Sequence, residues 1–193
     1  MAYQAKDFSA LIGTPGFSEQ LLKNHFSLYE GYVKNTNLLI ERLNALSAEG
    51  RSDTPLFAEL KRRFGWEYNG MRLHELYFGN ISKNPKPIST GLKKALAEAF
   101  GSFESFEGDF KSTGKSRGIG WAVLYMDAAT HELFNVWINE HDVGHLAEGK
   151  ILLIMDVFEH AFMLDYGLNR AAYIDAFWKA VDWGVVEQRL KGA

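Results

Sequence analysis

The sequence predicts a protein of the α+β class, with an N-terminal α-helical hairpin lobe and a C-terminal α/β lobe that holds a small three-stranded, mainly antiparallel sheet. Apolar residues recur at intervals of three and four over much of residues 19–78. A linker with two prolines follows at 84–87, and three short strand-like runs come after it. We therefore expect two domains, residues 1–84 and 88–193.

The composition excludes several classes of protein. Of the 193 residues, 47% are hydrophobic, and the net charge of −3 argues against binding to nucleic acid or to a membrane surface. No apolar run approaches the roughly 20 residues of a membrane-spanning helix, and the N-terminus lacks the apolar segment of a signal peptide. The absence of cysteine leaves His, Asp, Glu and water as metal ligands. We expect a cytoplasmic protein with no nucleic-acid or membrane partner.

A long amphipathic helix is expected over residues 18–48. A serine begins it as a suitable cap, and Gly31 is expected to interrupt it. His25, Tyr29 and Tyr32 lie along one stripe of this helix. A histidine on an apolar stripe is more often a satisfied core residue than a ligand, so His25 alone does not indicate a site.

A second helical segment follows the turn-rich connection at 48–55. It is expected from residue 55 to 64 and again, beyond Gly65, over the aromatic-rich stretch 68–78. Two long helices with a short connection favour an antiparallel hairpin. His74 lies on the apolar face of the second segment.

The second half of the chain mixes helices with short strands. Helices are expected at 89–101, 103–110, 159–165 and 171–190. Strands are expected at 121–126, 132–138 and 150–155, and a turn joins the first two as a hairpin. The polar, Gly-rich stretch 113–120 lacks the spacing of a phosphate-binding loop, so it is expected to be a plain loop.

Asp156 and His160 stand four residues apart directly after an apolar run. On one helical turn, their Cβ atoms would lie about 5–6 Å apart, which suits two ligands of one metal ion. An isolated buried carboxylate is costly, so Asp156 needs a cation or several hydrogen-bond donors. Two interpretations are open here: a hydrogen-bonded Asp–His pair in the core, and half of a metal site.

Other histidines could supply the second half of such a site. The candidates near aromatic clusters are His25, His74, His141 and His160. His131, in a hairpin turn, and His145, in a polar loop, are expected to be solvated. Three imidazoles and one carboxylate without a thiolate suit iron, manganese or zinc. Ligands from both lobes would place the metal between them.

These residues resemble the iron/manganese superoxide dismutases, and the resemblance covers nearly the whole chain. The most specific element is the run 156–162, DVFEHAF, which is close to the family motif DVWEHAY. Further matching pieces occur in the family's order and near its spacing: Asn69–Gly70, His74–Phe78, Gly118–Ala122, Tyr173–Trp178 and Trp183. So many separate matches are far more specific than one short motif.

The resemblance implies a superoxide dismutase, an oxidoreductase that disproportionates superoxide to dioxygen and hydrogen peroxide by redox cycling of one iron or manganese ion per subunit. It implies four protein ligands: His25, His74, Asp156 and His160. It gives catalytic roles to Tyr32, the gateway residue, and to His141. The latter stands where manganese enzymes carry a glutamine that hydrogen-bonds the solvent ligand. Imidazole is more basic than an amide, so we favour iron, with manganese as the alternative.

The resemblance also implies a shell of residues around the ligands, formed by Trp121, Tyr29, Phe158 and Glu159. Glu159 would hydrogen-bond His160 of the partner subunit and so link two sites in a homodimer. Met163 replaces the tyrosine that usually completes the gateway between subunits, and Tyr29 replaces a histidine.

One departure concerns the first ligand. The interval of seven from His25 to Tyr32 is one residue shorter than is usual in the family. Counting back from Tyr32 would give Asn24 as the ligand. We prefer His25, because asparagine is a poor ligand and the loss of a π-bulge would account for the deletion. The functional alternatives left open are a non-catalytic member of the same fold and a non-redox metal-binding protein or an iron oxygenase on similar ligands.

Overall fold

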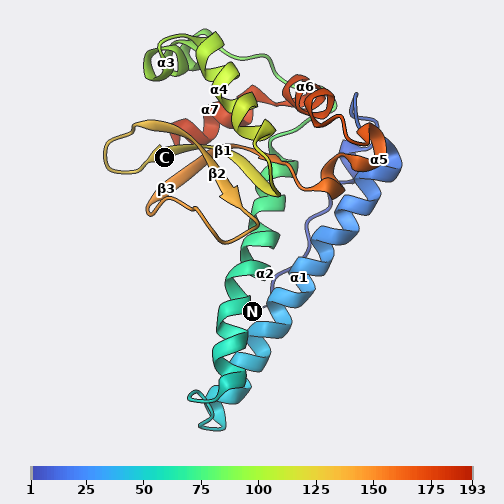
Figure 1. The fold of residues 1–193 in the computed structure, drawn as a ribbon, viewed down its shortest axis with the longest axis vertical. Helices are drawn as coiled ribbons and strands as arrows, with labels where there is room; N and C mark the ends of the chain where they lie inside the picture. Colours follow the sequence, from blue (N-terminus) through green and yellow to red (C-terminus); the bar gives the residue numbers. More distant parts are fainter. Residues whose placement is uncertain (1, 193) are drawn as a thin grey trace.

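A computed structural model describes residues 2–192 of the protein (Figure 1). These residues form seven α-helices, two short 3-10 helices and one three-stranded sheet, which confirms the predicted α+β class. Helices α1 (Glu19–Ala48) and α2 (Pro55–Gly79) form an antiparallel hairpin that extends as a narrow arm from the rest of the molecule (Figure 1). Over the described residues, no helix is both long enough and apolar enough to cross a membrane.

Side-chain caps begin both helices of the hairpin. Ser18 accepts a hydrogen bond from the Leu21 amide, and Thr54 accepts one from the Phe57 amide. Pro55 occupies the first turn of α2, where its missing N–H costs nothing.

Both hairpin helices are continuous, so the interruption expected at Gly31 is wrong, and α2 likewise runs through Gly65. A glycine costs a helix only about 1 kcal/mol relative to alanine. The two helices pack against each other and bury an apolar stripe that includes Leu39, Leu43 and Leu46. This packing offsets the cost of the glycines.

The sheet contains β1 (Gly120–Asp127), β2 (Leu133–Asn139) and β3 (Gly149–Asp156) in the order β2-β1-β3. Both strand pairs are antiparallel, and the central strand β1 is buried along almost its whole length. The register pairs Trp121 with Asp156 at the end of the sheet that meets the helical hairpin.

Helices cover the sheet. Helix α4 (Phe103–Lys115) packs on β1 and β2, and α7 (Trp183–Lys191) packs on β3. Helices α3 (Thr90–Phe100) and α6 (Arg170–Ala180) pack on α4. Helix α4 continues past its expected end at residue 110 and reaches Lys115. Gly114 makes this possible, because a Cβ on residue 114 would collide with the methyl group of Met155 on β3. The loop expected at 113–120 is shorter for that reason.

Two other predicted helices are wrong in detail. The single helix expected at 171–190 is divided into α6 and α7 by Val181, which is extended and pairs with Ile81. The helix expected at 159–165 is a 3-10 turn, η2 (Glu159–Ala161), followed by the short helix α5 (Met163–Tyr166). Phe162 separates them because its backbone is non-helical and its ring stacks on Tyr173.

A buried asparagine fixes α2 against the sheet. The Asn80 side chain is fully buried and donates to the Ile154 carbonyl at 3.2 Å, while the Ile154 amide donates back at 2.9 Å. Arg189 of α7 donates to the same Asn80 oxygen at 3.3 Å. These bonds hold the end of α2, and with it His74, in a fixed position relative to Asp156 of β3.

Candidate metal centre

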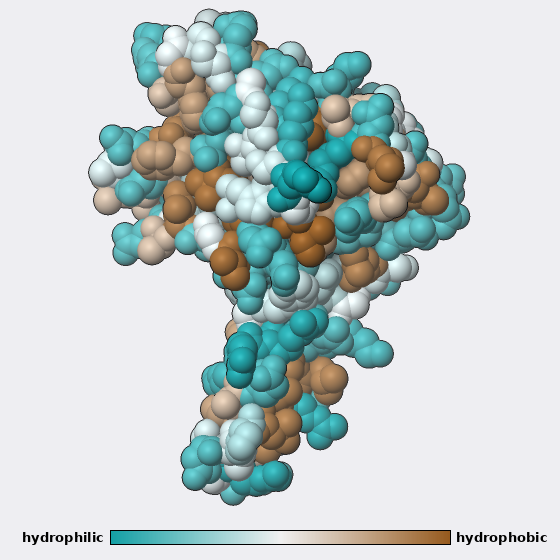
Figure 2. Space-filling model, viewed as in Figure 1, coloured by the Kyte–Doolittle hydropathy of each residue, from teal (hydrophilic) through white to brown (hydrophobic). Residues whose placement is uncertain are grey.

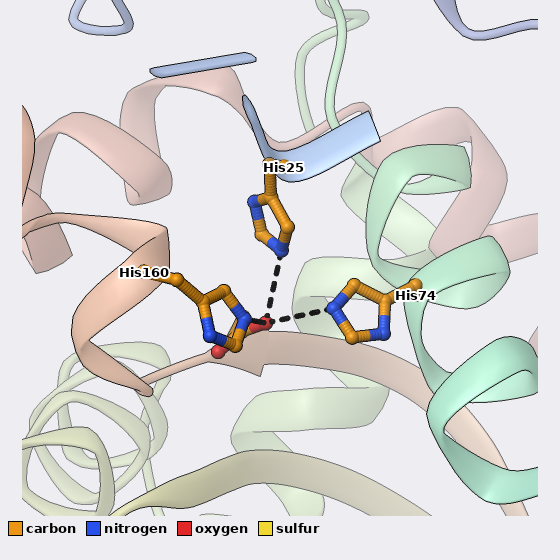
Figure 3. A group of neighbouring side chains, drawn as sticks. His25, His74 and His160 are labelled. Atoms are coloured by element: carbon orange, nitrogen blue, oxygen red, sulfur yellow. Dashed lines mark hydrogen bonds and ion pairs between the residues drawn. The ribbon is translucent and has the colours of Figure 1, made fainter. Parts of the chain in front are cut away.

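Four side chains from four separate elements meet in the interior. His25 comes from α1, His74 from α2, Asp156 from the end of β3 and His160 from η2. Figure 3 shows the three imidazoles directed at one carboxylate oxygen. Their candidate ligand atoms all lie within 4.8 Å of one another. Asp156 and His160 therefore converge from a strand end and a 3-10 turn, and not from one helical turn.

Asp156 is the centre of this group. Its Oδ2 lies 3.2 Å from Nε2 of His25, 3.2 Å from Nε2 of His160 and 3.5 Å from Nε2 of His74. Its Oδ1 accepts the Phe158 amide at 2.9 Å, which orients the carboxylate. Asp156 is fully buried, so its charge needs compensation by the groups around it.

His74 provides the test of whether these residues fit a metal ion. Its Nδ1 lies 2.5 Å from the Gly70 carbonyl oxygen, which can only accept, so Nδ1 carries the proton. Burial holds the pKa of His74 well below its usual value, so the ring is neutral and Nε2 is a bare lone pair. Among the described residues Nε2 finds no hydrogen-bond partner, although it is buried. A lone pair that faces a carboxylate oxygen is stable only with a cation between them, so the residues fit a metal ion.

The charges of the group agree with this conclusion. Burial also lowers the pKa of His25. At Asp156 burial favours the neutral acid, but the charge and hydrogen bond of His160, followed by those of His25, outweigh it and lower the pKa. One ionised carboxylate with imidazole nitrogens is a donor set that suits iron, manganese or zinc.

Three further predicted residues form a hydrogen-bonded chain beside the cluster. The Trp121 indole N–H donates to Nδ1 of His141 at 3.1 Å, so the His141 proton is on Nε2, which donates to the Tyr32 hydroxyl at 2.8 Å. The Tyr32 ring stacks on His74. Burial lowers the pKa of His141 to about 4 and raises the pKa of Tyr32, so both are neutral near pH 7. The Tyr32 hydroxyl therefore accepts from His141 and keeps its own proton.

Phe158 and Glu159 flank His160. The Phe158 ring stacks on His160 with centroids 5.1 Å apart and also contacts His141. The Glu159 side chain is exposed, and the His160 side chain is 28% exposed. The cluster thus reaches the molecular surface on the side of His160.

Tyr29 lies outside the cluster. Its hydroxyl donates to Glu75 at 3.1 Å and accepts the Lys6 amide at 3.0 Å. Burial raises its pKa to about 12. Asn24, the alternative ligand by counting, is exposed and bonds to Gln20. Of the two adjacent residues Asn24 and His25 on α1, only His25 faces the cluster.

Sequence reasoning missed two residues that touch His141. His145, expected to be solvated, is half-buried, and its Nε2 lies 2.8 Å from the His141 carbonyl oxygen. The Trp66 ring lies edge-on to His141 with centroids 4.8 Å apart. In the sequence, only the spacing of four residues between His141 and His145 indicated that these two histidines could touch. Only the high density of aromatic residues in α2 indicated the contact between Trp66 and His141. His131 is exposed, as expected.

Known proteins resemble this chain along most of its length. The family model for the C-terminal domain of iron/manganese superoxide dismutases matches residues 88–189. An iron superoxide dismutase of Pyrobaculum aerophilum is 31% identical over 184 residues, which cover 93% of this chain and 86% of that protein.

Two further relatives are also superoxide dismutases. An iron superoxide dismutase of Aquifex aeolicus is 33% identical over 196 aligned residues, covering 98% of this chain and 92% of that protein. Manganese superoxide dismutase 2 of Haloferax volcanii is 34% identical over 181 residues, covering 93% of this chain and 89% of that protein. The chain therefore belongs to the iron/manganese superoxide dismutase family.

Proposed function

We propose that His25, His74, Asp156 and His160 hold one iron or manganese ion, with which this enzyme disproportionates superoxide to dioxygen and hydrogen peroxide. The observation that carries the proposal is the lone pair of His74 Nε2 facing the Asp156 carboxylate. Relatives named as iron and as manganese superoxide dismutases support the same activity and both metals. Those names favour a redox enzyme over a non-catalytic or non-redox metal-binding protein. We favour iron.

When bound, the ion would supply one-electron redox chemistry, which none of the side chains offers by itself. The chain's own residues supply position and protons. The three imidazoles and the carboxylate determine where the ion binds. The aromatic rings of Trp121, Phe158 and Tyr32 pack beside them and limit the entry of water.

Formation of hydrogen peroxide consumes two protons. We assign the local proton donor to Tyr32, because its hydroxyl accepts from His141 and so has its own proton free to donate. Trp121 supports this role by fixing the proton of His141 on Nε2. We further propose that His141 sets the preference between iron and manganese, because its ring lies 5.9 Å from that of His74 and its Nε2 orients the Tyr32 hydroxyl beside the cluster.

We propose a homodimer in which Glu159 hydrogen-bonds His160 of the partner subunit. Glu159 is exposed, and Met163, Leu164 and Leu168 are 45%, 56% and 93% exposed. Figure 2 shows apolar side chains gathered over the part of the molecule where α5 lies. An exposed apolar patch beside the partly exposed His160 favours an interaction surface.

We also propose a division into two domains and a cytoplasmic location. The start of the C-terminal family model at residue 88 supports a boundary between domains 1–84 and 88–193, with the metal between them. The cytoplasmic location stays a prediction, which fractionation of the source cells would test.

The function is tested by measuring superoxide consumption and metal content on the same purified samples. We expect the rate to rise in proportion to bound iron or manganese, and a zinc-loaded sample to be inactive, because zinc does not change its oxidation state. Protein loaded with iron and with manganese that consumes no superoxide would contradict the proposal.

A further inference from the structure

We propose that His145 is a positioning residue for His141 and that Tyr125 holds His145 in place; the catalytic meaning of this inference rests on the proposed function. Nε2 of His145 lies 2.8 Å from the backbone carbonyl oxygen of His141. Its Nδ1 lies 2.9 Å from the Tyr125 hydroxyl oxygen. Neither His145 nor Tyr125 is among the four residues of the metal cluster.

The proton positions of this contact follow from its partners. A carbonyl oxygen only accepts, so His145 donates from Nε2 and its Nδ1 is the acceptor. Burial raises the pKa of Tyr125 to about 12, so its hydroxyl keeps its proton and donates to Nδ1. One neutral tautomer of His145 therefore satisfies both bonds. The Asn69 amide lies farther from Nε2, at 3.4 Å.

The loop between β2 and β3 needs such an anchor. Glu140 and Glu148 have φ values of 53° and 57°, in the left-handed region that is unfavourable for residues other than glycine. A conformation of this kind persists where surrounding contacts hold it. The bond from His145 back to the His141 carbonyl closes the loop between these two strained positions.

The sheet is built to place Tyr125 under this loop. The register of β1 with β3 shifts between Leu124 and Tyr125, because Leu152 of β3 has no partner on β1 and forms a bulge beside Tyr125. Gly149 makes room for the ring, because a Cβ there would lie 2.6 Å from it. The Tyr125 side chain is 2% exposed, so its hydroxyl is a rigid donor.

The consequence reaches the metal cluster through His141. Its two ring nitrogens bond Trp121 at 3.1 Å and Tyr32 at 2.8 Å, and both bonds require a fixed ring position. The backbone carbonyl held by His145 belongs to the same residue. Loss of that anchor would let His141 shift, weaken both ring bonds and leave the Tyr32 hydroxyl less ordered beside His74.

The test compares His145→Ala, His145→Gln and Tyr125→Phe with His131→Ala, which removes an exposed imidazole as a control. The first readout is the indole N–H resonance of Trp121 in the full chain loaded with diamagnetic zinc, assigned with Trp121→Phe. It reports the bond to His141 without any redox activity. The second readout is superoxide consumption per bound iron or manganese.

We expect His145→Ala to shift the Trp121 resonance and to lower activity per metal about tenfold, the low end of effects seen for groups that support metal ligands. His145→Gln should keep the Trp121 resonance and the activity per metal close to their wild-type values, because the glutamine amide can donate to the same His141 carbonyl. Tyr125→Phe should shift the resonance less, and His131→Ala should change nothing.

An unchanged Trp121 resonance in both His145→Ala and Tyr125→Phe would overturn the inference. Tyr125→Phe keeps the ring and the fold, so the test stands even if His145→Ala does not fold. If the wild type consumed no superoxide, the proposed function would fail, whereas the resonance shifts would still decide the role of His145.

Discussion

Nε2 of His74 and Oδ2 of Asp156 lie 3.5 Å apart in the interior, and neither atom carries a proton to share. The Gly70 carbonyl fixes the His74 proton on the other ring nitrogen, and the neighbouring imidazoles lower the pKa of Asp156 against the effect of burial. In the metal-free protein the bare Nε2 of His74 thus faces an ionised carboxylate, and a cation must complete this contact.

We expect Asp156→Asn to abolish metal retention and to destabilise the metal-free protein by about 1–3 kcal/mol, because the lowered pKa of Asp156 means that the fold stabilises the charged carboxylate that the amide replaces. Metal-loaded wild type should remain the most stable form, since a ligand bound only to the folded state stabilises it. Urea unfolding of chelated samples measures the difference. Asp53→Asn, at an exposed position, is the control. Equal stabilities of metal-free wild type and Asp156→Asn would show that the ionised carboxylate does not stabilise the metal-free protein.

His141 should determine how the enzyme responds to its metal. A glutamine can accept from Trp121 and donate to Tyr32, as His141 does, but it is less basic. We expect His141→Gln to change the ratio of iron-loaded to manganese-loaded activity, and His141→Ala to depress both activities. Activity per metal atom in each reconstituted form is the measurement. An unchanged ratio in both variants would rule out the role proposed for His141.

Gly70 leaves the space that the Tyr32 ring occupies. A Cβ at Gly70 would lie 2.5 Å from that ring, whereas a Cβ at Gly65 on the same helix would meet nothing within 4 Å. We expect Gly70→Ala to destabilise the protein by about 1–3 kcal/mol and to lower activity, because Tyr32 must move. Gly65→Ala should instead stabilise it by up to about 1 kcal/mol. Thermal unfolding and superoxide assays compare the pair, and equal behaviour of the two variants would argue against a fixed Tyr32.

Glu159 should link metal retention to assembly. We expect Glu159→Ala to weaken the dimer and to lower metal affinity about tenfold or more, because it removes a partner from a ligand histidine. Analytical ultracentrifugation and metal titration measure the two effects. Glu98→Ala, which removes an exposed carboxylate from α3, should change neither. A fully active monomeric wild type would contradict the proposed interface.

Local signals in the sequence predicted much of this structure. Ser18, the expected cap of the first helix, marked a real helix start, and the apolar run before Asp156 marked a real strand. The resemblance to the family, over several separate motifs, pointed to the four residues that the fold brings together.

What the sequence did not reveal depends on contacts between distant residues. Val181 divides a helix because it pairs with Ile81, a residue far away in the sequence. His145 is half-buried because Tyr125, on a neighbouring strand, donates to it. Composition made that loop look polar and solvated, since no local pattern records a bond across two strands.

The most direct test of the metal site compares two neighbours on α1. His25 is buried in the cluster, while Asn24 is exposed and bonds to Gln20. Elemental analysis of purified His25→Ala and Asn24→Ala, with superoxide consumption measured on the same samples, separates the two candidate ligands. We expect Asn24→Ala to keep about one iron or manganese ion per chain and wild-type activity, and His25→Ala to lose both, because it removes one of the few protein ligands of the ion. Loss of metal in Asn24→Ala with full retention in His25→Ala would contradict the proposed ligand set.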